Sequence, residues 1–324
     1  MRFEKRGKTL PGCKIKSSEK NALLPFGLDY IKLEEFLKGN QMNTLKTLVL
    51  MGCLTALIVA IGGVLGGRDG ITVAFFFAVC TNVFSYWFSA PIALRMSNAQ
   101  PVSRQQAPEL YDIVERIARH AQIPVPSIYV IPTDSPNAFA TGRDPEHSSI
   151  AVTEGIMRLL NWDELEGVLA HELAHVRNRD VLITTIAAVL ASVVTTVAHY
   201  GYYLGSYSDD RREGSNPIFV VLMAILAPIA ATLINLAISR SREFEADASG
   251  AELCGHPLAL ANALAKIDQT ARAVPFQDAN PALSSLYIIP PDPQSWFVQL
   301  MSTHPPTAER IQRLREMASK TGRL

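Results

Sequence analysis

The sequence predicts a mainly α-helical membrane protein, with four hydrophobic helices in two hairpins and a water-soluble α+β part that carries a small antiparallel sheet. Three observations lead to this prediction. Four apolar blocks of 21 residues or more contain no Asp, Glu, Lys or Arg, and each is long enough to cross a bilayer. Charged residues make up only 19% of the chain, which is low for a soluble protein. Short β-rich runs separated by Pro, Gly and Asp lie between the second and third blocks.

Residues 1–41 form a basic extension, with nine Lys or Arg residues against five acids and no long apolar core. A secretory signal is excluded because Lys14 and Lys16 fall where its apolar stretch would lie. The segment that begins at Met42, MNTLKTLVL, is typical of the start of a membrane protein. We therefore expect residues 1–41 to be disordered or peripheral.

The first predicted transmembrane hairpin occupies residues 42–96. Its spans are Thr47–Gly67 and Gly70–Leu94, and the polar residues between them predict a tight turn. Tyr86 and Trp87 lie near the end of the second span, where aromatic residues are typical of the boundary between membrane and water.

Residues 97–179 predict the first part of the water-soluble region. A helix is expected over residues 108–122, because apolar residues recur there at helical spacing. Three short runs then predict an antiparallel sheet: Ser127–Ile131, Asn137–Thr141 and Ser149–Val152. Such a sheet would either offer an edge on which a peptide lies extended or serve only as a support.

The pentapeptide HELAH runs from His171 to His175. Residues four apart lie on the same face of a helix, so both imidazoles can reach one metal ion. Glu172 would project beside them, close enough to take a proton from water. This is the pattern of a zinc peptidase, with two ligands, a general base and an open coordination position. The alternative is an amphipathic helix with two polar residues at helical spacing.

The residues around HELAH favour a helix. Asn161 and Glu164 have the spacing of a capping box. The apolar residues that follow recur at helical spacing and supply a buried face: Leu165, Val168, Leu169, Leu173 and Val176. Gly167 alone interrupts this run, at about 1 kcal/mol relative to Ala. The two histidines are therefore expected on one helix.

The second predicted hairpin occupies residues 180–239, with spans at Val181–Tyr207 and Gly214–Ser239. Because a helical hairpin returns its ends to the same side of the membrane, it would bring Glu243 beside the HELAH helix. A carboxylate is the expected third ligand of such a zinc site. Asp247, one turn later, would accept the outward N–H of a ligand histidine. The alternative makes both residues ordinary surface acids.

Residues 240–324 complete the water-soluble part, with an Ala- and Leu-rich helix near 256–273 and a closing THPPTAERI stretch. In that stretch His304 and Arg310 could donate to the oxyanion of a transition state. A capped surface helix with a stray histidine is the alternative.

The distribution of charge bears on two points: whether the chain binds nucleic acid, and on which side of the membrane HELAH lies. The chain has no net charge and no basic cluster near aromatic residues, which excludes nucleic-acid binding. Basic residues gather on one side of the four spans, so the positive-inside rule places the HELAH segment in the cytoplasm. These residues are Lys46, Arg95, Arg104, Arg177, Arg179, Arg240 and Arg242.

HELAH, SREFEAD, NAFATG and THPPTAERI together resemble the HtpX family of bacterial membrane-bound zinc metallopeptidases, whose superfamily includes the type I CAAX prenyl peptidases. The likeness covers residues 42–314 and leaves out residues 1–41. It implies a zincin-like catalytic domain, one Zn²⁺ per chain, and protein quality control at the bacterial inner membrane. By motif position it implies that His171, His175 and Glu243 bind zinc, with Glu172 as base and Asp247 orienting a ligand. It also places His304 and Arg310 near the reacting carbonyl, and residues 137–142 along the substrate cleft, Asn137, Ala138, Phe139 and Ala140 among them.

The sequence therefore predicts an endopeptidase that hydrolyses misfolded or damaged membrane proteins and unfolded polypeptides at the bilayer; it predicts no oligomeric state. A prenyl-peptide endopeptidase is one alternative, although that type encloses its cavity with more membrane helices. Intramembrane cleavage is disfavoured because Asp163, Glu164 and Glu166 precede the motif. A non-catalytic zinc-containing adaptor or chaperone would have no need of Glu172 as a base.

Overall fold

The computed structural model describes residues 30–186, 240–273, 288 and 305–322. The chain divides into two compact units, Met1–Met42 and Asn43–Leu324. In the first unit, helix begins at Tyr30, inside the segment for which we expected no regular structure. Most of the second predicted hairpin and His304 lie outside the described residues, so both stay predictions.

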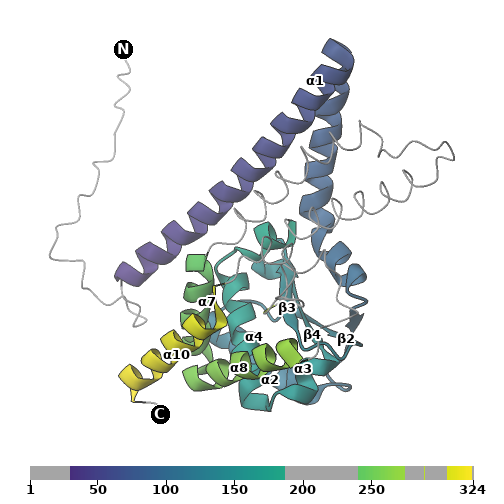
Figure 1. The fold of residues 1–324 in the computed structure, drawn as a ribbon. Helices are drawn as coiled ribbons and strands as arrows, with labels where there is room; N and C mark the ends of the chain where they lie inside the picture. The colour runs from purple at the N-terminus through teal and green to yellow at the C-terminus, as the bar shows by residue number, and fades with distance from the viewer. Residues whose placement is uncertain (1–29, 187–239, 274–287, 289–304, 323–324) are drawn as a thin grey trace, which may run out of the picture. The chain divides into compact units, whose positions relative to one another are not determined.

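Helix α1, Tyr30–Met96, contains the first predicted hairpin. Its helical geometry is interrupted at Gly66 and Gly67, where Gly67 has a φ of 57° that glycine adopts without steric penalty. The chain reverses there, just before the predicted turn at residues 68–70. The reversal joins two long helical arms, one on each side of it in the sequence (Figure 1). Asn82 on the second arm donates to the Thr55 hydroxyl on the first at 2.7 Å. The two arms therefore contact each other as a helical hairpin, and the crossing of a membrane by both stays a prediction.

The second arm of α1 exposes an apolar surface. Among the described residues, one helical segment, Gly66–Met96, is long and apolar enough to cross a membrane. Many of its large apolar side chains are exposed, and six aromatic ones are about half exposed or more: Phe75, Phe76, Phe77, Phe84, Trp87 and Phe88. A water-soluble protein rarely exposes so large a continuous apolar surface. The arm is thus suited to lipid contact.

The sheet has four strands: β1, Gln100–Pro101; β2, Ser127–Ile131; β3, Ala138–Gly142; and β4, Ser148–Thr153. Their order is β1-β2-β4-β3, and β2 pairs parallel with β4. The predicted purely antiparallel sheet is therefore wrong, although all three predicted strands exist. The short turn between β3 and β4 makes an antiparallel hairpin, which places β4 between β2 and β3. The strand β1 was not predicted, because two residues carry no periodicity.

Helices α2, Pro108–Ala121, and α4, Trp162–Arg177, form as the sequence predicts. The capping box of α4 is confirmed, because the Asn161 side chain accepts from the Glu164 N–H and the Glu164 carboxylate accepts from the Asn161 N–H. The apolar face of α4 is buried. A short helix, α3, Glu154–Leu159, connects β4 to the loop before α4.

Three further helices are α7, Arg240–Cys254, α8, Pro257–Ala273, and α10, Thr307–Thr321. Residues 181–186 are helical as well, and a 3₁₀ turn, Pro145–His147, lies between β3 and β4. Helix α4 lies at the centre of this unit and contacts β3, α2, α7 and α8 (Figure 1). One apolar core joins α2, the inner face of the sheet, α4, α7 and α8. The HELAH helix is therefore held on several sides, which fixes the position of its polar residues.

Two glycines let the helices approach α4 closely. A Cβ at Gly167 would lie 2.8 Å from the backbone nitrogen of Leu260 on α8. A Cβ at Gly250 on α7 would lie 2.8 Å from both the backbone nitrogen and the Cα of His171. Gly167, in the middle of α4, thus allows α8 to pack closely against α4. Gly250 allows α7 to contact α4 at His171, the first histidine of HELAH.

We expect Gly250→Ala to destabilise the protein by about 1–3 kcal/mol, because backbone atoms would have to move apart to admit the methyl group. The shift would also separate α7 from α4 and weaken metal binding. Thermal unfolding in detergent and chelator competition measure the two effects. Gly52→Ala is the matched control, since a Cβ there meets nothing within 4 Å. Equal behaviour of the two variants would contradict the close contact.

Candidate metal centre

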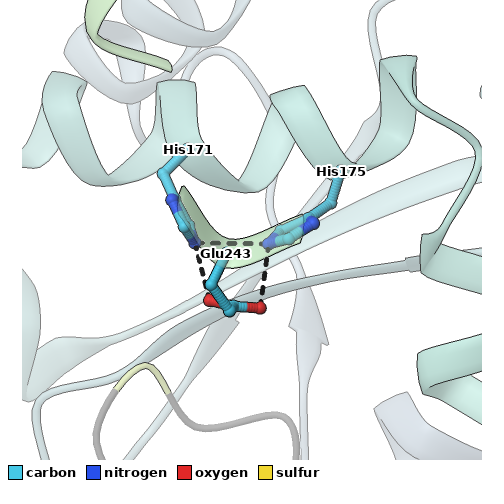
Figure 2. Close-up of side chains that lie close together, drawn as sticks. All are labelled: His171, His175 and Glu243. Carbon is cyan, nitrogen blue, oxygen red and sulfur yellow. Dashed lines mark hydrogen bonds and ion pairs between the residues drawn. The ribbon is translucent and has the colours of Figure 1, made fainter. Parts of the chain in front are cut away.

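Three side chains converge between α4 and α7. His171 and His175 project from one side of α4 toward the Glu243 carboxylate on α7 (Figure 2). The two Nε2 atoms are 3.2 Å apart, and each lies 3.6 Å from a different oxygen of Glu243. The three residues form a cluster able to hold a metal ion. The sequence predicted that these three residues lie close together, and in the structure they form one cluster.

The distances within the cluster fit a zinc ion. Ligand atoms about 2.0–2.1 Å from a tetrahedral Zn²⁺ are about 3.3–3.4 Å from one another. The two Nε2 atoms, 3.2 Å apart, are close to that value, and one ligand atom from each of the three residues lies within 4.8 Å of the others. Two imidazoles and one carboxylate are also the ligand set of many catalytic zinc sites, in which the fourth position is left for water or substrate. The donor set therefore suits a catalytic metal.

The outward nitrogens of both histidines face buried carboxylates. The Nδ1 of His171 lies 3.0 Å from Asp247, and the Nδ1 of His175 lies 3.1 Å from Asp180. A proton on each Nδ1 leaves the Nε2 lone pair directed into the cluster, as metal binding requires. Asp247 thus has the predicted contact. Asp180 was missed, although its place directly after α4 was the available signal.

Arg310 on α10 holds Asp247 from behind. Its Nε and Nη2 lie 2.8 and 2.7 Å from the two carboxylate oxygens, a bidentate arrangement that arginine favours. Both side chains are buried, and Nη2 is also 3.4 Å from the His171 ring. In the structure the guanidinium therefore supports the ligand shell, a contact that its predicted role as an oxyanion donor did not include.

Glu172 lies on the same helix and faces β3. It is 8% exposed, and its Oε2 accepts a hydrogen bond from the Ala140 N–H at 3.0 Å. The strand β3 is at the edge of the sheet, and in an antiparallel pair alternate N–H groups point away from the partner strand. The edge of β3 that pairs with no other described strand therefore faces Glu172.

Burial and charge shift the ionisation of these groups. Burial raises the pKa of Glu172 above its usual range, although the neighbouring histidines favour its charged form. Burial opposes the charged form of His175, but the carboxylates of Asp180, Glu243 and Glu172 together outweigh it and raise the pKa of His175 to about 10 in the metal-free site. Burial opposes the charged form of Asp247 too, and Arg310 outweighs it, so the pKa of Asp247 is well below its usual range. A metal ion must therefore displace a proton from His175, so its affinity rises with pH.

The residues predicted to line a substrate cleft have mixed placements. Ala138, Phe139 and Ala140 lie on β3, and the N–H of Ala140 reaches Glu172. Phe139 packs in a small apolar cluster with Ala93 and Leu94 at the end of α1. The Asn137 side chain accepts a hydrogen bond from the Ile288 backbone at 3.1 Å. The backbone of the strand, more than its side chains, is thus directed at the metal cluster.

We expect Asp180→Asn to lower zinc affinity about 10- to 100-fold, because a ligand histidine loses the charge that orients it and raises its basicity. Chelator competition measures the affinity. Asp163→Asn is the control, since Asp163 is exposed in the first turn of the same helix. Unchanged affinity in Asp180→Asn would show that the contact with His175 is incidental.

The chain is similar in sequence to a known family of proteins. The model of peptidase family M48 matches residues 104–318. A protease HtpX homologue from Pyrococcus furiosus is 52% identical over 280 residues, which are 86% of this chain and 96% of that protein. One from Burkholderia multivorans is 49% identical over 283 residues, 87% and 99% of the respective chains. Among solved structures, S. mikatae Ste24p is 20% identical with a TM-score of 0.46, covering 86% of this chain and 67% of its own.

Proposed function

The chain belongs to peptidase family M48 and is a metalloprotease, and from this premise we propose a membrane-bound zinc endopeptidase that cuts misfolded or damaged membrane proteins on the cytoplasmic side. The resemblance to HtpX is thereby confirmed. One observation carries the proposed chemistry: a buried carboxylate, Glu172, lies next to a cluster of two histidines and a glutamate that could hold a metal ion. A purely structural metal site needs no such base.

His171, His175 and Glu243 would hold the zinc ion. When bound, zinc supplies a Lewis acid beside the scissile carbonyl. Glu172 takes a proton from the attacking water and delivers it to the leaving amine. The raised pKa of Glu172 suits both steps, because a base works best when its pKa approaches the working pH. Asp180 and Asp247 keep the two imidazoles oriented.

The substrate backbone would lie along the edge of β3 that pairs with no other described strand. An extended peptide can add to an exposed strand edge through main-chain hydrogen bonds. Support comes from the Ala140 N–H, which is directed at Glu172 and hence at the place where the scissile bond must lie. Main-chain recognition requires little of the side chains, which suits an enzyme that acts on unfolded polypeptides of varied sequence.

The membrane location is supported by the apolar second arm of α1 and by Arg95 at its end. Basic residues next to a span favour the cytoplasmic side. That arm and the metal cluster belong to the same compact unit. The enzyme would therefore act on polypeptide segments close to the bilayer.

The test uses the full chain in proteoliposomes and in detergent. We expect cleavage of an unfolded polypeptide in detergent that stops after chelation and returns with zinc. In proteoliposomes, a misfolded membrane protein in the same bilayer should be cut faster than a soluble unfolded protein. Equal rates on the two substrates would count against a preference for membrane proteins. Metal binding without any cleavage would instead favour the adaptor alternative.

A further inference from the structure

A pocket lies where the end of α1 meets the sheet. Its volume is about 640 Å³. The last turns of α1 form one wall, with Trp87, Leu94 and Arg95. The opposite wall is formed by the sheet and by the turn after β3, with Tyr129 and Arg143 among its residues. None of the residues that line this pocket belongs to the metal cluster.

The pocket lies beside the end of the second arm of α1, where the exposed apolar side chains are followed by polar ones. Phe84, Trp87 and Phe88 are the last large apolar side chains of the arm that are about half exposed. Arg95 follows Trp87 by eight residues, which is about 12 Å along a helix. Tryptophan and tyrosine gather at the headgroup level of bilayers, and Tyr86 and Trp87 both line the pocket. A membrane that covers the apolar arm would place its headgroups at the pocket mouth.

The polar groups of the pocket suit a phosphate. The Arg143 guanidinium stacks 4.0 Å over the Trp87 ring, and its bond to Asp144 uses Nε, so neither Nη1 nor Nη2 has a hydrogen-bond partner among the described residues. Arg95 is exposed, and within the described ranges no carboxylate pairs with it. The side chains of Ser127 and Ser149 add hydroxyl donors to the lining. Guanidinium groups bind phosphate oxygens in pairs of hydrogen bonds, and an arginine held flat on an aromatic ring has little orientational freedom left to lose.

We propose that this pocket binds the phosphodiester headgroup of a membrane lipid, with Arg95 and Arg143 on the phosphate and Trp87 beside the first carbons of the chains. The inference rests on the membrane insertion of the second α1 arm in the proposed function. Glu146 also lines the pocket, and its carboxylate disfavours a headgroup with more than one negative charge. A lipid bound here would tie the end of the arm to the sheet that faces Glu172.

The experiment is native mass spectrometry of the full chain in detergent, titrated with dioctanoyl phosphatidylglycerol. We expect one lipid to bind preferentially to the wild type. Arg95→Gln and Arg143→Gln should each weaken that binding about tenfold, the effect of losing one charged hydrogen-bonding partner. Arg119→Gln is the matched control, because Arg119 is an exposed arginine on α2 that does not line the pocket. Dioctanoylglycerol, which has the same chains and no phosphate, should bind at least about tenfold more weakly.

Three outcomes would overturn the proposal. Equal binding by the wild type and both arginine variants would remove the phosphate contacts. Equal binding of dioctanoylglycerol would leave only an apolar surface. Displacement of the lipid by inorganic phosphate at the same concentration would make the pocket a site for free anions. Zinc content, measured on each variant, verifies that the fold is intact. Failure here is distinct from failure of the proposed function, because lipid retention is measured without cleavage.

Discussion

Glu172→Gln should reduce kcat by about 10²–10⁴-fold while the chain still binds one zinc ion. Positioned acid–base groups contribute rate factors of this size, and the amide can take no proton from water. Glutamine has nearly the same shape as glutamate, so its carbonyl oxygen can keep the hydrogen bond from the Ala140 N–H. Structure and metal content should therefore survive the change. Cleavage of an unfolded polypeptide and metal analysis, carried out on the same preparation, measure both quantities.

Glu166→Gln is the matched control for that variant. Glu166 lies on the same helix, but its carboxylate pairs with the half-exposed Arg116 at 2.7 Å. Pairs of this kind at the surface contribute at most about 1 kcal/mol, so the control should cleave at the wild-type rate. Full activity in Glu172→Gln would eliminate Glu172 as the base. Loss of zinc in that variant would show that the residue acts through metal retention.

Arg310→Met should destabilise the protein by about 3–5 kcal/mol and weaken metal binding. The variant leaves the buried Asp247 carboxylate without its bidentate partner, and breaking one side of a buried ion pair has an effect of this size. The midpoint of thermal unfolding in detergent should fall by on the order of 10 °C. Zinc affinity should fall as well, because Asp247 would no longer be held against the His171 ring.

Two further variants separate this role from catalysis. Arg315→Met, on the same helix but exposed, should leave both the unfolding midpoint and the zinc affinity unchanged. The double variant Arg310→Met with Asp247→Asn should recover part of the lost stability, since it removes the uncompensated charge. If Arg310→Met loses cleavage alone, with unfolding and zinc affinity intact, the guanidinium acts on the substrate, as the sequence suggested.

The local features of the site were predictable because they are encoded in neighbouring residues. Asn161 and Glu164 have the spacing of a capping box, and HELAH places two histidines on one helical face, so the helix could be read from about 17 residues. The hairpin of α1 was predictable for the same reason, since its apolar arms and its glycines are local signals. The identity of the third ligand needed one additional step, which was the return of the chain to the same side of the membrane.

The pairing of the strands in the sheet could not be predicted from such local signals. The three longer strands were found from their composition, but their pairing was wrong, because residues that favour β structure do not state which strand becomes the neighbour. The buried pattern of β3 and β4 fits a strand covered on both faces, and that cover comes from helices elsewhere in the chain. Strand order therefore depended on packing that no short window contains.

The sequence by itself determined which groups are available for the proposed chemistry: the two imidazoles, the carboxylate beside them, the carboxylate on a later helix, and the apolar arm. It could do so because each depends on residue type and on helical spacing within one element. Only the tertiary structure decided that Asp180 holds His175, that Gly250 lets α7 touch α4, and that Arg310 holds Asp247 across 63 positions. These contacts join separate elements, and their geometry is fixed by the packing of a shared core, which periodicity along the chain does not encode.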